Sequence, residues 1–156
     1  SGKNSTEKGY MNKSGTNENG WKGCARRTWC NNVYFKALPT TWQSMVKTVN
    51  KKTSIGYMQS DLETVQDKIF LASEIEIFGS IDCSFVGEGT QYQYYKKATA
   101  NRYKMPKWTN FYDSNIYFER SPFNKNNYSF CCVGGNGTPG ANAAYDGIGI
   151  APCLCI

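Results

Sequence analysis

The sequence predicts an α+β domain, in which helix signals come early in the chain and strand signals come late. Two observations carry this prediction. Apolar residues recur with a helical period near residues 39–50, and short apolar and aromatic segments follow one another after residue 117.

A first helix is expected over residues 39–50. Pro39 suits the first turn of a helix, where a backbone N–H would have no partner inside the helix. Five apolar residues then lie at helical spacing, which predicts that one face of this helix packs on a sheet. They are Leu38, Trp42, Met45, Val46 and Val49.

A short buried strand is expected at 67–72, DKIFLA, followed at once by a helical turn. Ser73 and Glu76 have the spacing of a capping box, in which each side chain accepts from a backbone N–H at the start of a helix. Gly79 is the residue type that ends such a turn. Glu74 and Glu76 flank apolar residues here, so both carboxylates are expected to face water.

Three more strands are expected in the last forty residues, at 117–121, 128–133 and 148–156. The sequence GGNGTPG, at 134–140, is typical of a loop and interrupts them.

The length of 156 residues and the hydrophobic content of 40% suit a single domain with its own core. No apolar run approaches the roughly 20 residues that span a bilayer, so no membrane insertion is expected. Residues 1–20 are polar and rich in Lys, Asn, Gly and Ser, and are expected to be a flexible linker or a vector-derived remnant. The folded domain is expected over 21–156.

The net charge of +6 is spread along the chain rather than concentrated. Its basic pairs lie in no recognisable nucleic-acid reading helix or base-stacking motif, so no nucleic-acid partner is expected.

Seven cysteines and no histidine limit the metal and redox chemistry. An odd count leaves at least one thiol outside any disulfide within the chain, and no CxxC pair indicates a zinc site. Most of the cysteines are expected to be small buried apolar residues. We expect no metal and no cofactor.

Catalysis is also not expected, because the chain lacks histidine. Histidine is the commonest general base and the usual partner of a Ser or Cys nucleophile. A calcium site stays open as an alternative, since oxygen donors are available in the loops at Asp113, Asn115, Asn136, Asn142 and Asp146. Their spacing is not that of an EF-hand.

The segment after residue 110 is poor in charge and rich in Tyr, Asn, Ser, Phe and Gly. Binding loops favour these residues, because rigid aromatic rings supply contact area and small amides and hydroxyls supply adaptable hydrogen bonds.

Five blocks of sequence occur in an order that resembles a domain family of bacteriophage tail and bacterial surface proteins with the C-type-lectin-like fold, the fold of the formylglycine-generating enzymes. The blocks are GWKGCARRTWCNNVYFKALPTTWQSMVKTV, DKIFLASEIEIFGS, GEGTQYQYY, FERSP and GIGIAPCLCI, and the resemblance covers residues 21–156. The resemblance implies two helices on a mixed or antiparallel sheet, with long irregular loops. Two residues depart from the family pattern: Glu119 stands at a position that is often apolar, and Leu154 stands in place of the usual Phe.

Members of this group resemble the variable proteins of diversity-generating retroelements, whose adenine-directed mutagenesis randomises chosen codons near the C-terminus. Mutated AAC and AAT codons give Tyr, Asn, Asp, Ser, Phe and Gly, but never Lys, Glu, Gln, Met or Trp. The resemblance therefore implies a variable region at about 108–147 that binds a host-cell surface protein or glycan. It implies a location on a virion tail or a bacterial cell surface, with a homo-oligomer formed through the full-length protein.

Arg120, Ser121 and Pro122 are expected to be scaffold. The expected contact residues are Phe111, Tyr112, Asp113, Ser114, Asn115, Phe123, Asn126, Asn127, Tyr128, Asn136, Asn142, Tyr145 and Asp146. Two alternatives remain open, a calcium-dependent carbohydrate-binding domain and an oxidase of the formylglycine-generating type. The oxidase would use Cys131, Cys132 or Cys153, but adjacent residues on a strand point to opposite faces.

Overall fold

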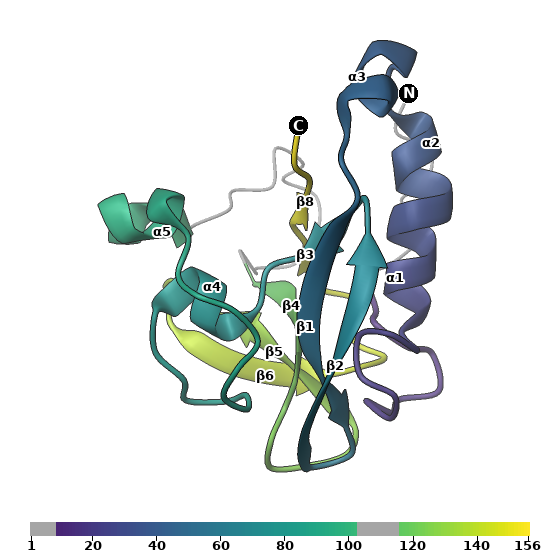
Figure 1. The fold of residues 1–156 in the computed structure, drawn as a ribbon. Helices are drawn as coiled ribbons and strands as arrows, with labels where there is room; N and C mark the ends of the chain where they lie inside the picture. Colours follow the sequence, from purple (N-terminus) through teal and green to yellow (C-terminus); the bar gives the residue numbers. More distant parts are fainter. Residues whose placement is uncertain (1–8, 103–115) are drawn as a thin grey trace.

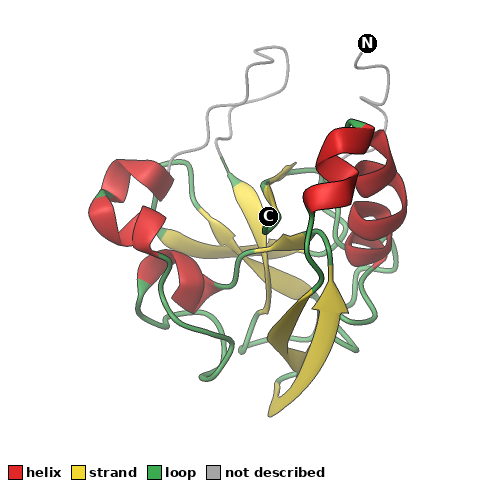
Figure 2. Cartoon of the chain, turned by 45° about the horizontal axis from the view of Figure 1, so that its top comes forward, coloured by secondary structure: helices red, strands yellow, loops and turns green. Residues whose placement is uncertain are grey.

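A computed structural model of the protein describes residues 9–102 and 116–156. Its described part combines short helices with three small sheets, which confirms the α+β prediction (Figures 1 and 2). Among those residues, no helix has the length and apolar character needed to cross a bilayer.

The longest helical segment lies earlier than the sequence predicted. It runs without a break through α1 (Ala25–Trp29), the π-helical turn η1 (Cys30–Tyr34) and α2 (Phe35–Ala37). The residues buried along it are few, so the apolar period that marks an amphipathic helix is weak.

The helix expected over 39–50 is shorter than predicted. It is present as α3 (Thr40–Met45) and ends at Val46, whose backbone is extended. The Lys47 amide then donates to the carbonyl of Cys155, and Val49 begins a strand. Trp42 and Met45 are about half exposed, so this helix does not bury the expected apolar face.

The strands of the described residues form three separate sheets. β1 (Val49–Gly56) and β2 (Gln59–Asp67) make an antiparallel hairpin, and β3 (Phe70–Leu71) pairs with β8 (Pro152–Cys153). The third sheet has the order β6-β5-β4-β7. Its members are β4 (Tyr117–Pro122), β5 (Ser129–Val133), β6 (Pro139–Ala143) and β7 (Gly149–Ile150).

Most of the expected late strands are confirmed, with two differences. The expected strand at 148–156 divides into β7 and β8, which belong to different sheets. β6 lies partly inside the expected loop 134–140, because the small residues of PGANA pair along β5 although they show no apolar alternation.

The capping box predicted at Ser73 is confirmed at the start of α4 (Glu74–Phe78). The Ser73 side chain accepts from the Glu76 amide, and Glu76 accepts from the Ser73 amide. Gly79 ends the helix in the left-handed conformation, with φ of 74°. Two short helices follow, α5 (Gln93–Lys97) and the 3-10 turn η2 (Thr99–Arg102).

The main core lies between the first helical segment, the sheets and the N-terminal residues. Its large, fully buried side chains include Trp21, Phe118 and Phe130. Four of the seven cysteines, Cys24, Cys30, Cys131 and Cys132, are buried free thiols, as expected. A second cluster packs α4 and α5 on the outer part of the same sheets, through Phe78, Tyr95 and Tyr117.

Residues 9–20 are part of the folded body, so the expected linker does not extend through them. Met11 and Asn17 have no exposed surface. The Met11 and Asn12 amides both donate to the carbonyl of Ala144, and the Arg26 amide donates to the carbonyl of Met11. The polar composition of this segment hid its role, because Asn12, Thr16 and Asn17 bond to backbone carbonyls inside the fold.

Candidate functional site

The motif Arg120-Ser121-Pro122 lies at the buried centre of the molecule, as the scaffold prediction requires. The Arg120 guanidinium forms a salt bridge with Glu76 and donates to the carbonyls of Leu71 and Glu88. Lys51 contributes a second cation at 3.1 Å from the other carboxylate oxygen of Glu76. Burial alone would raise the pKa of Glu76, but Arg120 and Lys51 hold it below its ordinary value.

Glu88 joins this buried polar centre from the loop before α5. Its carboxylate accepts from the Ser121 hydroxyl and from the Ser54 amide, the latter at 2.7 Å. Through these bonds, β4 is tied to β1 and to the segment that leads into α5. Burial raises the pKa of Glu88.

Glu74 and Glu76 are buried, so the expectation that they face water is wrong. The Glu74 carboxylate accepts from the backbone amides of Asp82, Cys83 and Ser84, at 2.7–3.1 Å. A carboxylate with this many donors is satisfied in the interior, which explains why an acid can occupy an inward position of α4. Both acids therefore stabilise the scaffold.

Asn17 connects three loops at one end of the molecule. Its Nδ2 donates to the carbonyl of Ser129 at 2.8 Å, at the start of β5, and to that of Asn126 at 3.0 Å, in the β4–β5 turn. Its Oδ1 accepts from the amide of Tyr57 at 2.9 Å, at the tip of the β1–β2 hairpin. We call this region, residues 15–20, 56–58, 123–128 and 144–146, the loop end.

The tip of the β1–β2 hairpin has an unusual sequence for its backbone conformation. Gly56 pairs with Gln59, so the turn has two residues, Tyr57 and Met58, and both have positive φ, of 57° and 60°. A turn with positive φ at both positions normally contains Asn-Gly or a similar pair. A left-handed residue other than glycine costs roughly 1–2 kcal/mol.

Gly56 allows the backbone of the tip to lie close to that of Asn17. A Cβ atom at this position would lie 1.9 Å from the backbone oxygen of Asn17, and its φ is also positive, at 78°. The close approach and the conformation both require glycine.

Tyr128 and Tyr145 lie at the same end, and they are 52% and 61% exposed. The Ala144 amide donates to the carbonyl of Tyr128 at 2.8 Å, so the loop after β6 is held beside the β4–β5 turn. The Tyr145 ring packs beside Gly15. Tyr57 and Met58 are 46% and 50% exposed, and they add two more large side chains to the loop end.

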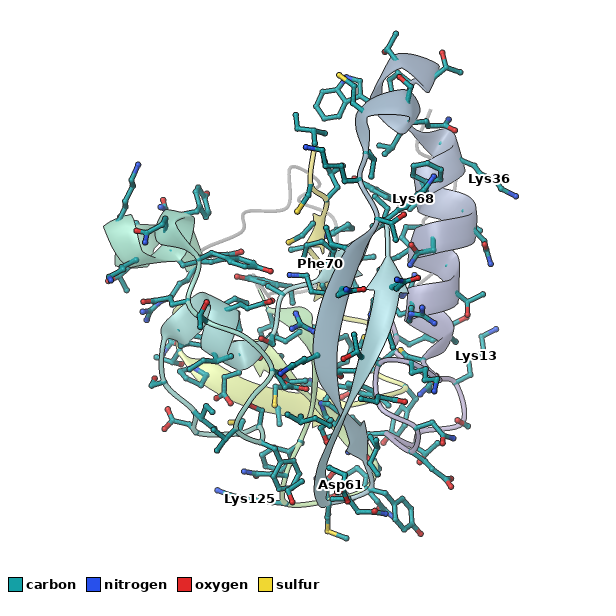
Figure 3. All side chains as sticks on the ribbon, in the orientation of Figure 1. Lys13, Lys36, Asp61, Lys68, Phe70 and Lys125 are labelled. Atoms are coloured by element: carbon teal, nitrogen blue, oxygen red, sulfur yellow. The ribbon has the colours of Figure 1, made fainter. Side chains whose placement is uncertain are left out.

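Two parts of the loop end, the turn of the β1–β2 hairpin and the turn between β4 and β5, meet at the lower edge of the molecule in Figure 1. Figure 3 places Asp61, from β2, and Lys125, from the β4–β5 turn, at this same edge. The exposed charges around it are of both signs, since Glu18 lies there as well.

The remaining expected contact residues divide into three groups. Phe111, Tyr112, Asp113, Ser114 and Asn115 lie outside the described residues. Phe123, Asn126 and Asn127 lie in the β4–β5 turn and are half-buried. Asn142, Asp146 and Asn136 lie on or beside β6.

Several of these polar side chains bond within the protein. Asn126 Oδ1 accepts from the amides of Tyr128 and Ser129, and therefore shapes the β4–β5 turn. Asn142 Nδ2 donates to Asp146 at 3.2 Å. Asn136 lies in the turn before β6 and accepts from the Thr138 hydroxyl, at the opposite end of the strand from Asp146.

Among the described residues, the expected calcium donors do not all lie around one point, and Asp113 and Asn115 lie outside those residues. Asn136 precedes β6 and Asp146 follows it, so the strand separates them. Within residues 9–102 and 116–156, no group of three His, Cys, Asp or Glu side chains could hold a metal ion.

Two of the candidate oxidase cysteines, Cys131 and Cys132, are poorly suited to thiolate chemistry. Burial raises the pKa of Cys132 to about 12, and burial with the nearby Glu119 raises the pKa of Cys131 well above its ordinary value. Cys131 and Cys132 are buried on β5, as the sequence predicted for a strand.

A polar hollow on another face lies between η1 and the end of β2, lined by Arg27, Asn31, Asp67 and Lys68, among others. Its polar groups are used within the fold: Arg27 forms a salt bridge with Asp67 at 2.8 Å, and Asn31 donates to the carbonyl of Ile69. These bonds therefore join the helix to the hairpin.

Sequence reasoning missed two parts of the loop end, Asn17 and the pair Tyr57–Met58. Asn17 lies in a segment of linker-like composition, and the hairpin tip lacks the Asn-Gly or Asp-Gly pair that identifies a two-residue turn. Gly56 was the one local signal of a turn there.

A family model described as a domain of unknown function, DUF6273, matches residues 2–156. No curated protein and no solved structure matches the chain.

Proposed function

The chain belongs to the DUF6273 family, and we propose that this member binds a ligand on a host or cell surface through replaceable side chains on a C-type-lectin-like scaffold. The single observation that carries the proposal is the contrast along the C-terminal tail. Arg120 and Cys131 have no exposed surface, whereas Tyr128, between them, is half exposed. Large exposed rings on loops, next to a fixed interior, are typical of contact surfaces.

The loop end suits side-chain replacement because its conformation depends on backbone groups. Asn17 bonds to the carbonyls of Asn126 and Ser129, and the Ala144 amide bonds to the carbonyl of Tyr128. A change of the Tyr128 or Tyr145 side chain leaves these bonds intact. Such a surface can alter its specificity without altering its fold.

The residue types at these positions support a retroelement variable protein. Phe123, Asn127, Tyr128, Tyr145 and Asp146 are all accessible from AAC or AAT codons by change at adenine. Lys125 is not, so under this proposal that position is either fixed or templated by another codon. On a virion tail or bacterial surface, several copies of the domain in a homo-oligomer would raise weak single-site binding by avidity.

Two alternatives receive less support. A calcium-dependent carbohydrate-binding domain needs several oxygen donors around one point, and β6 separates Asn136 from Asp146. An oxidase of the formylglycine-generating type needs accessible thiolates, and the raised pKa values of Cys131 and Cys132 oppose ionisation. We propose that the protein is not an enzyme.

The test of this proposal is the DNA sequence around the gene. We expect a non-coding repeat nearly identical to the coding tail, differing from it almost only at adenines, and a reverse-transcriptase gene nearby. An intact locus with neither feature would overturn the retroelement assignment, and the fold would be unaffected.

A further inference from the structure

We propose that the contact surface includes the hairpin tip Tyr57–Met58, which lies far upstream of the tail in sequence. Asn17 positions this tip beside the β4–β5 turn. The partner is a protein with an exposed apolar side chain. This inference rests on the proposed function and extends it to residues outside the C-terminal region.

The tip and the tail are joined through one buried side chain. Asn17 has no exposed surface, and it bonds simultaneously to the Tyr57 amide and to the carbonyls of Asn126 and Ser129. Residues separated by about seventy positions in sequence are therefore adjacent at the loop end. Tyr145 completes the arrangement by packing beside Gly15, two residues before Asn17.

The backbone conformation of the tip indicates that stability does not account for its two side chains. Tyr57 and Met58 both occupy the left-handed region that favours Gly or Asn, and both are about half exposed. Neither the backbone nor burial explains a large apolar residue at either position. Strain of this kind, held by surrounding structure, is common at binding sites.

The chemistry of the loop end favours a protein partner over a glycan. A sugar needs several hydrogen-bonding side chains directed at its hydroxyls, but Asn126 Oδ1 and Asn17 are already bonded to backbone groups. Met58 offers no strong donor or acceptor to a hydroxyl. Tyr and Met side chains are enriched in protein interfaces, and the surrounding charges of Glu18, Asp61 and Lys125 are mixed, which suits a nearly neutral partner surface.

A random-peptide library displayed on phage is a suitable probe, because independent peptides selected against a protein concentrate on its strongest contact patch. Peptides are selected on the wild-type chain, and the affinity of each is then measured for three double variants. These are Tyr57→Asn with Met58→Asn, Tyr128→Ser with Tyr145→Ser, and Trp42→Ala with Met45→Ala. Asn suits the left-handed turn, so the first variant keeps the hairpin.

The third variant is a matched control. Trp42 and Met45 are 47% and 49% exposed, close to the values of Tyr57 and Met58, but they lie on α3 at the opposite end of the molecule (Figure 1). We expect most peptides to lose affinity about tenfold or more with each of the first two variants, and less than about twofold with the control.

The outcomes separate the two proposals. Loss with the Tyr128 and Tyr145 variant alone would overturn the extension to the hairpin and leave the proposed function standing. Loss with neither loop-end variant would overturn both. Wild-type binding to a glycan array that the hairpin variant abolishes would overturn the choice of a protein partner.

Asn17→Ala tests the positioning role. At a temperature well below melting, the Asn17→Ala variant should bind the same peptides more weakly than the wild type does. Its Tyr57 amide should also exchange with solvent deuterium faster than in the wild type. A lower melting temperature with unchanged affinity would show that Asn17 only stabilises the fold, and would overturn its positioning role.

Discussion

Glu119 and Arg120 are consecutive on β4 and both are fully buried, yet only Arg120 has partners. The guanidinium bonds to Glu76 and to backbone carbonyls, whereas neither carboxylate oxygen of Glu119 has a hydrogen-bond partner within the described structure. Successive residues of a strand point to opposite faces, so the two side chains meet different surroundings. Burial, with the nearby Glu74 and Glu88, raises the pKa of Glu119 well above its ordinary value.

This relationship predicts a dependence of stability on pH. The folded state retains the Glu119 proton at pH values where the unfolded state has lost it. The free energy of unfolding should therefore fall as pH rises above the ordinary value of 4.5, until the raised pKa of the folded state is passed. Glu119→Gln removes this titration, and its urea-unfolding curves should show a smaller fall over the same range.

Glu119→Leu removes the buried polar group as well as the titration. We expect it to raise the free energy of unfolding at pH 7 by about 1–3 kcal/mol, because an unpaired polar group no longer has to be desolvated. A lower stability for both variants at neutral pH would show that the carboxyl group has a partner that stabilises the fold.

Arg120→Ala should be among the most destabilising single changes. Removal of the guanidinium leaves the buried carboxylate of Glu76 without its closest cation, a loss that typically costs about 3–5 kcal/mol. Lys22→Ala is the control, because Lys22 pairs with Glu63 on the surface and should change stability by less than about 1 kcal/mol. Equal effects in chemical denaturation would contradict the assignment of Arg120 to the scaffold.

The hairpin tip predicts a conflict between stability and binding. Tyr57→Asn with Met58→Gly gives the turn the residues that its backbone favours, and should raise the free energy of unfolding by roughly 1–2 kcal/mol. The same change should weaken peptide binding at the loop end. Thermal unfolding checks the first part, and an unchanged or lower melting temperature would show that the tip is unstrained.

The four buried thiols should react slowly in the native protein. Burial raises the pKa of Cys24 to about 11 and of Cys30 to about 12, and Cys131 and Cys132 are also buried and raised. Alkylation near pH 7 should label these four cysteines only after unfolding in urea. Rapid labelling of native Cys131 or Cys132 would restore the oxidase as an alternative.

The sequence predicted the parts of the fold that depend on local chemistry. Ser73, Glu76 and Gly79 specify α4 through short-range bonds, and short aromatic and apolar runs mark the start of β4 and most of β5 as strands. The buried acids could not be predicted, because Glu74 is satisfied by amides of residues 82–84, which only the folded chain brings near it.

The loop end was predictable only in part, for the same reason. Tyr128 and Tyr145 stand out in a tail of binding-loop composition, and both are exposed as expected. Asn17 and Tyr57 meet only in the folded protein, where Asn17 reaches from the N-terminal segment to the hairpin tip and the β4–β5 turn.

Sequencing the coding tail from many individuals of one population shows whether replaceable loop side chains on a fixed scaffold carry the binding function. We expect substitutions concentrated at Phe123, Asn127, Tyr128, Tyr145 and Asp146, with β4 (Tyr117–Pro122) and β5 (Ser129–Val133) unchanged. Substitutions spread evenly over loops and strands, or a tail identical in every individual, would contradict it.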